Sequence, residues 1–255
     1  MKVLELFSGT HSVGVVCKEK GLDVTSLDRD LGSKSKLYNY ESINHIQEDI
    51  MTFDYKKHFK EGEFDLVTAS PVCAWWSIMR KCTCSKEKIE NDINLYGKPM
   101  VDKVIDIINY LKPKFYWIEN PYTGLMKKYI KDKYPDIHLK NYVVDYCQYD
   151  DNIGYQKRTI FWTNIPNLNP KLCKGQGKCN NMNGTRHRIN IAAHQYVFDK
   201  GKKIMVNTKE LREKYKDFEI HKQDTTKNRY DRYKIPFSLI EELIDKCIDT
   251  NPYSE

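Results

Sequence analysis

Two side chains with the chemistry of a catalytic pair follow two separate apolar runs. Cys73 follows Phe64–Val67 across the small-residue turn Ala69-Ser70-Pro71, and Glu119 directly follows Phe115–Ile118. Short apolar runs bounded by turn residues predict buried strands. A thiol where a strand meets a helix N-terminus is closer to its thiolate, because exposed backbone N–H groups favour negative charge there. Cys73 is therefore a candidate nucleophile, with a thiol packed under a loop as the alternative.

Glu119 is the matching candidate acid. It comes two residues after Trp117 and is followed by the turn Asn120-Pro121. This setting predicts a partly desolvated carboxyl group that holds a proton near neutral pH. The alternative is a capping role at the start of a helix expected between Gly124 and Tyr129.

A further cluster near the amino terminus predicts a nucleotide-like ligand. Lys2–Leu6 predicts a strand, the turn FSGTHSVG follows it, and VVCKEKG predicts a helix. A strand, a glycine turn and a helix N-terminus let such a ligand approach the backbone closely. The next predicted strand, Leu22–Leu27, ends at Asp28 and Asp30, where a carboxylate accepts hydrogen bonds from ribose hydroxyls. This pattern fits nicotinamide dinucleotides and S-adenosylmethionine equally.

The elements that position these groups alternate between strands and helices. A third strand is predicted to end near Asp49, and a helix over Ile89–Leu111 is predicted to break at Gly97-Lys98-Pro99. Tyr142–Tyr146 and Thr159–Trp162 predict an antiparallel pair of strands. The alternation predicts an α/β fold with a doubly wound sheet, whose ligands bind at the carboxyl ends of the strands.

Composition limits the class of protein. The chain has 255 residues, of which 40% are hydrophobic, enough for one large α/β domain or a domain plus a smaller one. No apolar run approaches the roughly 20 residues that span a bilayer, and the eight cysteines are irregularly spaced. We expect a soluble protein of the cytoplasm or nucleus with reduced thiols, rather than a membrane protein or a disulfide-stapled secreted one.

The charge is uneven along the chain. The net charge is +7, and Lys171–Lys234 is dense in Lys and Arg interleaved with His and Tyr. Such a stretch is typical of a nucleic-acid surface, and a solvated basic face is the alternative. Turn residues are frequent from residue 165 to 228, which predicts a small irregular region after the sheet, and an amphipathic helix is predicted near the carboxyl terminus.

Five segments taken together resemble a cytosine-5 DNA methyltransferase, particularly the compact kind of phages and large viruses. In chain order they are LELFSGTHSVG, SPVCAWWS, WIENPYTG, YCQYDDNIGYQKRTIFWTN and RYKIPFSLIEELI. The resemblance implies a Rossmann-like S-adenosylmethionine-dependent methyltransferase sheet over residues 1–164. It further implies a small target-recognition region over 165–228, and a segment 229–255 whose helix returns to the catalytic domain.

The resemblance also implies roles for the candidate residues. Cys73 would add to carbon 6 of a cytosine flipped out of double-stranded DNA, and Glu119 would protonate or hydrogen-bond ring nitrogen 3. Lys157 and Arg158 would hold the base carbonyl or the target phosphate. The residues implied to bind S-adenosylmethionine are Phe7, Ser8, Gly9, Thr10, His11, Ser12, Asp28, Arg29, Asp49, Ile50, Ser70 and Pro71. We expect a monomer.

The sequence departs from the family pattern at several positions. His11 replaces the usual glycine of the first motif, and Val72 replaces the proline that commonly precedes the nucleophile. Trp75 and Trp76 stand where smaller residues are usual, and QKR replaces the standard Gln-Arg-Arg pattern. Two other functions therefore stay open: a catalytically altered protein that binds S-adenosylmethionine and DNA, and a methyltransferase that acts on RNA or a free nucleotide.

Several cysteines and histidines offer a zinc site as another possibility. Cys173 and Cys179 precede His187 and His194, and a small irregular domain would benefit from a metal ion. The spacing CKGQGKC is wider than the two to four residues usual between paired ligands. The tight pair Cys82 and Cys84 could join the site. The spacing favours free thiols, and we predict no metal.

Overall fold

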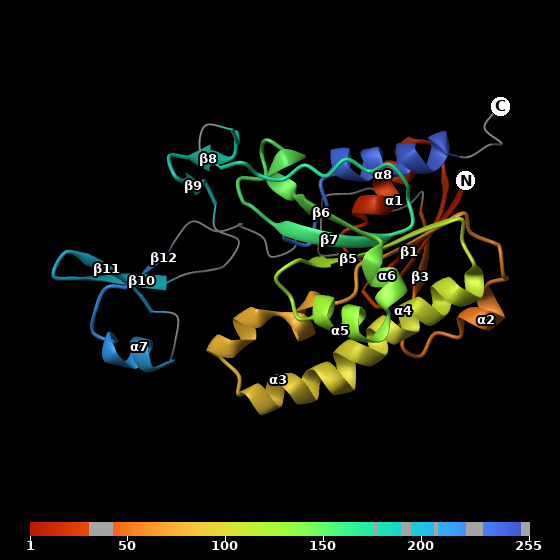
Figure 1. The fold of residues 1–255 in the computed structure, drawn as a ribbon. Coiled ribbons are helices and arrows are strands. Elements are labelled where there is room, and N and C mark those ends of the chain that lie inside the picture. Colours follow the sequence, from red (N-terminus) through yellow and green to blue (C-terminus); the bar gives the residue numbers. More distant parts are fainter. Residues whose placement is uncertain (31–42, 176–177, 190–194, 207–208, 223–231, 251–255) are drawn as a thin grey trace.

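The core of the protein is a seven-stranded sheet in the order β3-β2-β1-β4-β5-β7-β6 (Figure 1). The computed structural model describes residues 1–30, 43–175, 178–189, 195–206, 209–222 and 232–250. The strands are β1 (Lys2–Leu6), β2 (Asp23–Asp28), β3 (Asn44–Gln47), β4 (Leu66–Ala69), β5 (Phe115–Pro121), β6 (Asn141–Asp145) and β7 (Arg158–Thr163). Pairing is parallel from β3 to β5, and β7 runs antiparallel to both β5 and β6. The predicted α/β class and the predicted antiparallel pair are confirmed.

Helices cover both faces of the sheet. Figure 1 shows α1 (Ser12–Glu19) and α8 (Phe237–Asp249) on one face. The other face carries α2 (Tyr55–His58), α3 (Lys86–Asp92), α4 (Lys98–Leu111), α5 (Met126–Lys133) and α6 (Pro135–Leu139). Two large clusters of buried apolar side chains lie in this main body, one containing the apolar side of α4 and the other that of α8. Across the described ranges, no helix has the length and hydropathy needed to cross a membrane.

Short helical turns connect these elements. They are η1 (Cys73–Trp76), η2 (Ile78–Cys82), η3 (Ile93–Gly97) and η4 (Tyr146–Gln148). The helix predicted over Ile89–Leu111 does not break at Gly97, since α3 continues through the π-helical turn η3 into α4, with Pro99 in its first turn. Pro99 has no N–H to donate, and it is tolerated at the junction of the π-helical turn and α4, where the regular α-helical hydrogen-bond pattern is already interrupted. Also, β3 ends at Gln47, earlier than the predicted end near Asp49.

A smaller lobe follows β7. It holds the ribbon of β8 (Met182–Asn183) and β9 (Arg186–His187), and a three-stranded sheet of β11 (Lys202–Met205), β10 (Gln195–Asp199) and β12 (His221–Lys222). With α7 (Lys209–Lys214), this sheet has its own small core around Val197, Val206 and Tyr215. It lies to one side of the main sheet in Figure 1. The division into 1–164, 165–228 and 229–255 stays a prediction.

Candidate active site

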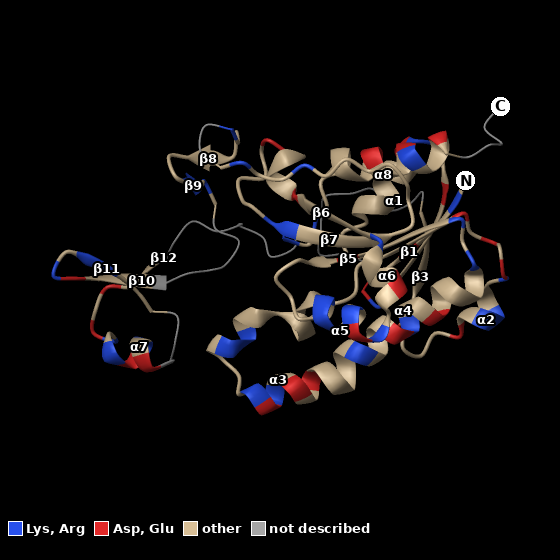
Figure 2. Ribbon diagram, viewed as in Figure 1, with Lys and Arg blue, Asp and Glu red and all other residues tan. Residues whose placement is uncertain are grey.

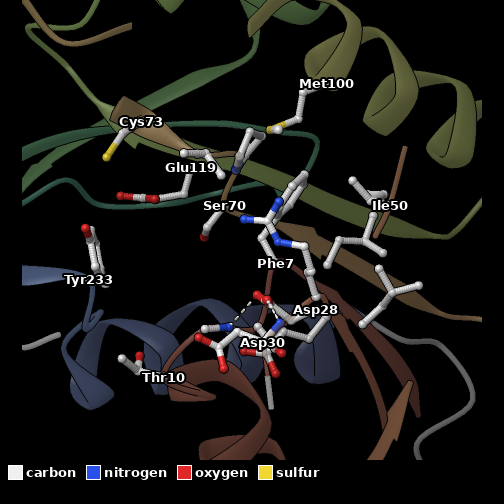
Figure 3. Close-up of a pocket in the computed structure, with 18 of the residues that line it drawn as sticks. Phe7, Thr10, Asp28, Asp30, Ile50, Ser70, Cys73, Met100, Glu119 and Tyr233 are labelled. Atoms are coloured by element: carbon white, nitrogen blue, oxygen red, sulfur yellow. Dashed lines mark hydrogen bonds between the residues drawn. The ribbon is translucent and has the colours of Figure 1, made fainter. Parts of the chain in front are cut away.

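A cavity of about 720 Å³ opens at the carboxyl ends of the parallel strands. Nearly all the predicted site residues line it: Phe7, Ser8, Gly9, Thr10, Ser12, Asp28, Arg29, Asp49, Ile50, Ser70, Pro71, Cys73, Glu119 and Lys157. Figure 3 shows Cys73 and Glu119 toward one end and Asp28 with Thr10 toward the other. His11 and Arg158 do not line the cavity. The sheet order therefore brings residues of six chain segments to one edge, as expected for a doubly wound fold.

The Asp28 end is built from the loop after β1. The backbone turns sharply there, with positive φ at Phe7 (58°), Gly9 (48°) and His11 (54°). One carboxylate oxygen of Asp28 accepts the Gly9 N–H at 3.0 Å, and the other accepts the Asp30 N–H at 2.8 Å. The Ser8 hydroxyl is buried and has no hydrogen-bond partner among the described residues. This end therefore presents a fixed carboxylate and a buried hydroxyl to a ligand.

His11 lies under the loop rather than in the cavity. Its ring is buried, lies 5.2 Å from the ring of His45, and places Nδ1 3.8 Å from a carboxylate oxygen of Glu5. Burial, with a contribution from His45, lowers the pKa of His11 to about 4. Burial also raises the pKa of Glu5 to about 7, although Ser26 donates a hydrogen bond to its carboxylate. His11 is thus a neutral core side chain, and its positive φ of 54° is a conformation that glycine adopts without strain, which explains why glycine is usual at this position.

Cys73 opens a four-residue 3₁₀ turn, not an α-helix. The predicted lowering of its pKa by a helix N-terminus is therefore wrong. Instead, burial raises the pKa of the Cys73 thiol, Lys157 opposes that shift and Glu119 adds to it. The thiol is protonated near neutral pH in this state, and Lys157 is the cation that favours its thiolate.

Glu119 lies near the end of β5 and is buried. The Tyr146 hydroxyl donates a hydrogen bond of 3.0 Å to its Oε1, and the Lys157 ammonium lies 3.8 Å from the same oxygen. Lys157 in turn donates to the Arg232 carbonyl at 3.0 Å. The capping alternative fails, because the residue that caps α5 is Leu125. Glu119 is therefore held by a hydroxyl and a cation at the Cys73 end of the cavity.

An amide side chain ties the Cys73 loop to β5. The Asn120 side-chain nitrogen donates to the Pro71 carbonyl at 2.9 Å, and the Leu125 N–H bonds to the Trp76 carbonyl at 2.8 Å. Because β4 and β5 are parallel neighbours, Ala69 pairs with Ile118 and both loops leave the sheet together. This register sets Cys73 and Glu119 side by side.

Arg158 faces away from the cavity. Its guanidinium makes two hydrogen bonds, of 3.0 and 2.8 Å, to the carboxylate of Asp145 on the paired strand. The Cys173 N–H also donates to Asp145 at 2.8 Å. Although burial acts in the opposite direction, these donors hold the pKa of Asp145 below its usual range. Asp145 and Tyr146 were not predicted as site residues from the sequence, although the antiparallel register of the two predicted strands pairs Asp145 with Arg158.

The two tryptophans after Cys73 have different surroundings. Trp75 lines the cavity and stacks on Tyr96 with ring centroids 4.8 Å apart. Trp76 is buried and stacks on Tyr129, and a Cβ at Gly97 would lie only 2.9 Å from its ring. The second tryptophan is accommodated because the facing helix has a glycine at that position.

Basic side chains are spread over the smaller lobe and α5 (Figure 2). In the smaller lobe, Lys203 lies over the ring of Tyr196, 3.7 Å from its centroid, and Phe198 is 51% exposed. Lys171 instead pairs with Glu242 at 2.9 Å. His194 and Tyr230, which the sequence analysis also assigned to this basic region, lie outside the described residues.

Comparison with known proteins gives two matches over nearly the whole chain. The family model of C-5 cytosine-specific DNA methylases matches residues 1–251. A probable DNA (cytosine-5)-methyltransferase of Frog virus 3 (isolate Goorha) is 35% identical, over 97% of this chain and 100% of the viral protein.

Solved structures give weaker likenesses. A SAM-dependent methyltransferase from Archaeoglobus fulgidus is 16% identical with a TM-score of 0.32, over 48% of this chain and 45% of the other. A putative methyltransferase from an antibiotic biosynthesis pathway of Anabaena variabilis is 8% identical with a TM-score of 0.30, over 46% and 38%. TM-scores this low support no conclusion about function.

Proposed function

Because the chain belongs to the C-5 cytosine-specific DNA methylase family, we propose that it transfers a methyl group from S-adenosylmethionine to carbon 5 of cytosine in duplex DNA. One observation carries the proposal: Cys73, Glu119 and Lys157 line the same cavity as Asp28 and the loop after β1. A nucleophile, an acid and a cation stand in reach of a site suited to a nucleoside. The family supplies the reaction class, and the geometry supports the roles.

The Asp28 end of the cavity fits S-adenosylmethionine. A volume of about 720 Å³ lies in the range of small-molecule sites. Each Asp28 oxygen accepts one backbone N–H, which leaves lone pairs for the ribose hydroxyls, and Asp49 with Ile50 would hold the adenine. The unpartnered Ser8 hydroxyl offers a hydrogen bond to a polar group of the ligand. When bound, S-adenosylmethionine supplies an electrophilic methyl group.

In the proposed reaction, Cys73 adds to carbon 6 of a cytosine that has left the base stack. This addition raises electron density at carbon 5, which by itself is a poor nucleophile. Burial disfavours the Cys73 thiolate, and the positive charge of Lys157 favours it. Carbon 5 then bonds to the methyl group, its proton is lost, and the Cys73 sulfur departs from carbon 6, which restores the ring double bond and returns the enzyme to its starting state.

Glu119 would protonate or hydrogen-bond ring nitrogen 3 while the sulfur is attached. Tyr146 and Lys157 fix its carboxyl group from two sides. For Arg158, the pairing with Asp145 supports a positioning role, since it joins β6 to β7 next to Lys157 and Tyr146. Of Lys157 and Arg158, Lys157 is the one that lines the cavity and would act there.

The smaller lobe is our candidate for target recognition. It carries exposed basic and aromatic side chains, which suit contacts with phosphates and unstacked bases. Residues 165–228 would grip the DNA, while α8 packs onto α1, where Lys20 pairs with Asp245 at 2.5 Å. We propose that the protein acts as a monomer.

The test is transfer of labelled methyl from S-adenosylmethionine to unmethylated duplex DNA, with the product nucleosides separated by mass. We expect 5-methylcytosine from the unaltered protein and from Cys82→Ala, whose thiol is exposed and outside the cavity, but none from Cys73→Ala. Transfer to RNA or a free nucleotide alone would favour another substrate. Cofactor binding with no transfer to any acceptor would favour a catalytically altered protein.

A further inference from the structure

Three cysteines and one histidine converge outside the proposed active site. Cys147 lies in η4 directly after β6, Cys173 and Cys179 lie between β7 and β8, and His187 lies in β9. Their three sulfur atoms and one imidazole nitrogen all lie within 4.8 Å of one another. We call these four residues the Cys₃His cluster. It joins the turn after β6 to the described residues around Cys173, Cys179 and His187.

The spacing within the Cys₃His cluster matches a tetrahedral zinc site. Nε2 of His187 lies 3.6 Å from Sγ of Cys173 and 3.6 Å from Sγ of Cys179. Bond lengths of about 2.3 Å for Zn–S and about 2.0–2.1 Å for Zn–N place sulfur and nitrogen about 3.6 Å apart at tetrahedral angles. All eight cysteines are free, so a disulfide does not account for the approach of these sulfurs.

We propose that Cys147, Cys173, Cys179 and His187 bind one zinc ion that fastens the chain around Cys173, Cys179 and His187 to the catalytic sheet. Three thiolates and an imidazole are ligands that select zinc over magnesium or calcium. Four protein ligands fill a tetrahedral shell and leave no open position, which makes the site structural rather than catalytic. A metal site of this kind supplies folding energy to an irregular segment with little core of its own.

Free thiols were predicted because the CKGQGKC spacing is wide for paired ligands, and Cys147 was not among the candidate ligands. Cys147 comes from the β6–η4 junction, far from the CKGQGKC segment in sequence, and only the fold joins the two. Cys82 and Cys84 are not part of the cluster, and His194 lies outside the described residues.

The backbone around the ligands is already fixed by hydrogen bonds. The fully buried Asn181 donates to the Cys147 carbonyl at 3.0 Å and accepts the Gly154 N–H at 2.7 Å. The Cys173 N–H donates to Asp145 at 2.8 Å. Partners that orient ligands in this way are typical of metal sites.

The position of the cluster links it to the active site. Tyr146, whose hydroxyl holds Glu119, stands between Asp145 and Cys147 in the chain. An ion bound by Cys147 would therefore steady the turn that carries Tyr146. It would also set the start of the smaller lobe relative to the cavity.

The first test is the zinc content of the purified protein, measured by elemental mass spectrometry in the absence of S-adenosylmethionine and DNA. We expect about one zinc per chain in the unaltered protein and in Cys82→Ser, and loss of most of it in Cys173→Ser and His187→Ala. Because no substrate is present, this result is independent of the proposed methyl transfer.

A second measurement separates loss of the site from loss of folding. The unaltered protein is stripped with a chelator under reducing conditions and titrated with Co²⁺. We expect thiolate-to-cobalt charge transfer and the visible bands of tetrahedral cobalt, abolished by adding Zn²⁺. A protein that carries no zinc as purified and gives no such bands, with its thiols reduced, would overturn the proposal. So would a native Cys173–Cys179 disulfide, seen as an intact mass lower by two hydrogens.

Discussion

Replacing Asp28 by asparagine should weaken the binding of S-adenosylmethionine by about 10- to 100-fold. The two Asp28 oxygens accept the N–H groups of Gly9 and Asp30 at 3.0 and 2.8 Å. Asparagine has one acceptor oxygen, so its NH₂ group would face one of these donors and the negative charge offered to the ribose would be lost. A hydrogen bond to a charged group contributes about 1.5–3 kcal/mol, and about 1.4 kcal/mol is a tenfold change in affinity.

The assay is calorimetric titration of the purified protein with S-adenosylmethionine. Asp23→Asn is the matched control, because Asp23 is an exposed residue at the opposite end of the same strand. We expect the control to bind as the unaltered protein does, and both variants to unfold in one transition at similar urea concentrations. Binding by a folded Asp28→Asn within about twofold of the unaltered protein would refute the assignment of Asp28 to the cofactor.

Three further expected results rest on burial and packing. The stability of Glu5→Gln relative to the unaltered protein should increase by up to about 3 kcal/mol as the pH rises from about 4.5 to 7. Burial raises the pKa of Glu5 to about 7, so over this interval the unfolded chain ionises Glu5 more readily than the folded protein does, and the unaltered protein loses stability. Urea unfolding of both proteins at pH 5 and pH 8 checks this, and a difference independent of pH would contradict it. Cys73 in the free protein should react with iodoacetamide more slowly than the exposed Cys82 at neutral pH, and its rate should still rise above pH 9, because burial raises its pKa above the ordinary value of 9.0. Peptide mapping of alkylated protein measures both rates, and a Cys73 rate that levels off below pH 8 would show a stabilised thiolate instead. Gly97→Ala should lower the free energy of unfolding by roughly 1 kcal/mol, since overlap with the Trp76 ring costs about 1–3 kcal/mol and the gain in helix propensity is about 1 kcal/mol. Thermal denaturation tests this, and an unchanged or higher midpoint would mean that the ring moves freely.

Much of the site was predictable because it depends on strand ends. Cys73, Glu119 and Asp28 each follow an apolar run, and a parallel sheet brings such positions to one edge whatever the lengths of the helices between them. The five motifs in order also predicted the family, which the match over residues 1–251 confirms.

What the sequence did not predict depends on packing between distant segments. His11 was assigned to the ligand by its place in a motif, but its ring turns into the core against Glu5 and His45. Arg158 was assigned by type, although the buried Asp145 pairs with it. The break predicted at Gly97 did not form, because a glycine inside a helical pattern can serve the packing of a facing ring as well as a turn.

The pKa of the Cys73 thiol also depends on packing that the sequence does not reveal. The sequence indicated the turn before it but not its helical type, and a 3₁₀ turn of four residues offers little of the dipole that was expected to lower its pKa. Burial then decides the direction of the shift, and Lys157 supplies the opposing charge. Neither burial nor the approach of Lys157 can be read from the neighbouring residues in sequence.

The most direct test of the covalent role of Cys73 is a trapping experiment with duplex DNA that contains 5-fluorocytosine. Completion of the reaction needs loss of a proton from carbon 5, and fluorine cannot leave as a cation, so the sulfur stays attached to carbon 6. With S-adenosylmethionine present, we predict a protein–DNA complex that survives denaturation and whose digested peptide carries the modified base on Cys73. An adduct on another residue, or methylation of ordinary cytosine by the same protein without any adduct on the fluorinated DNA, would contradict the proposed mechanism.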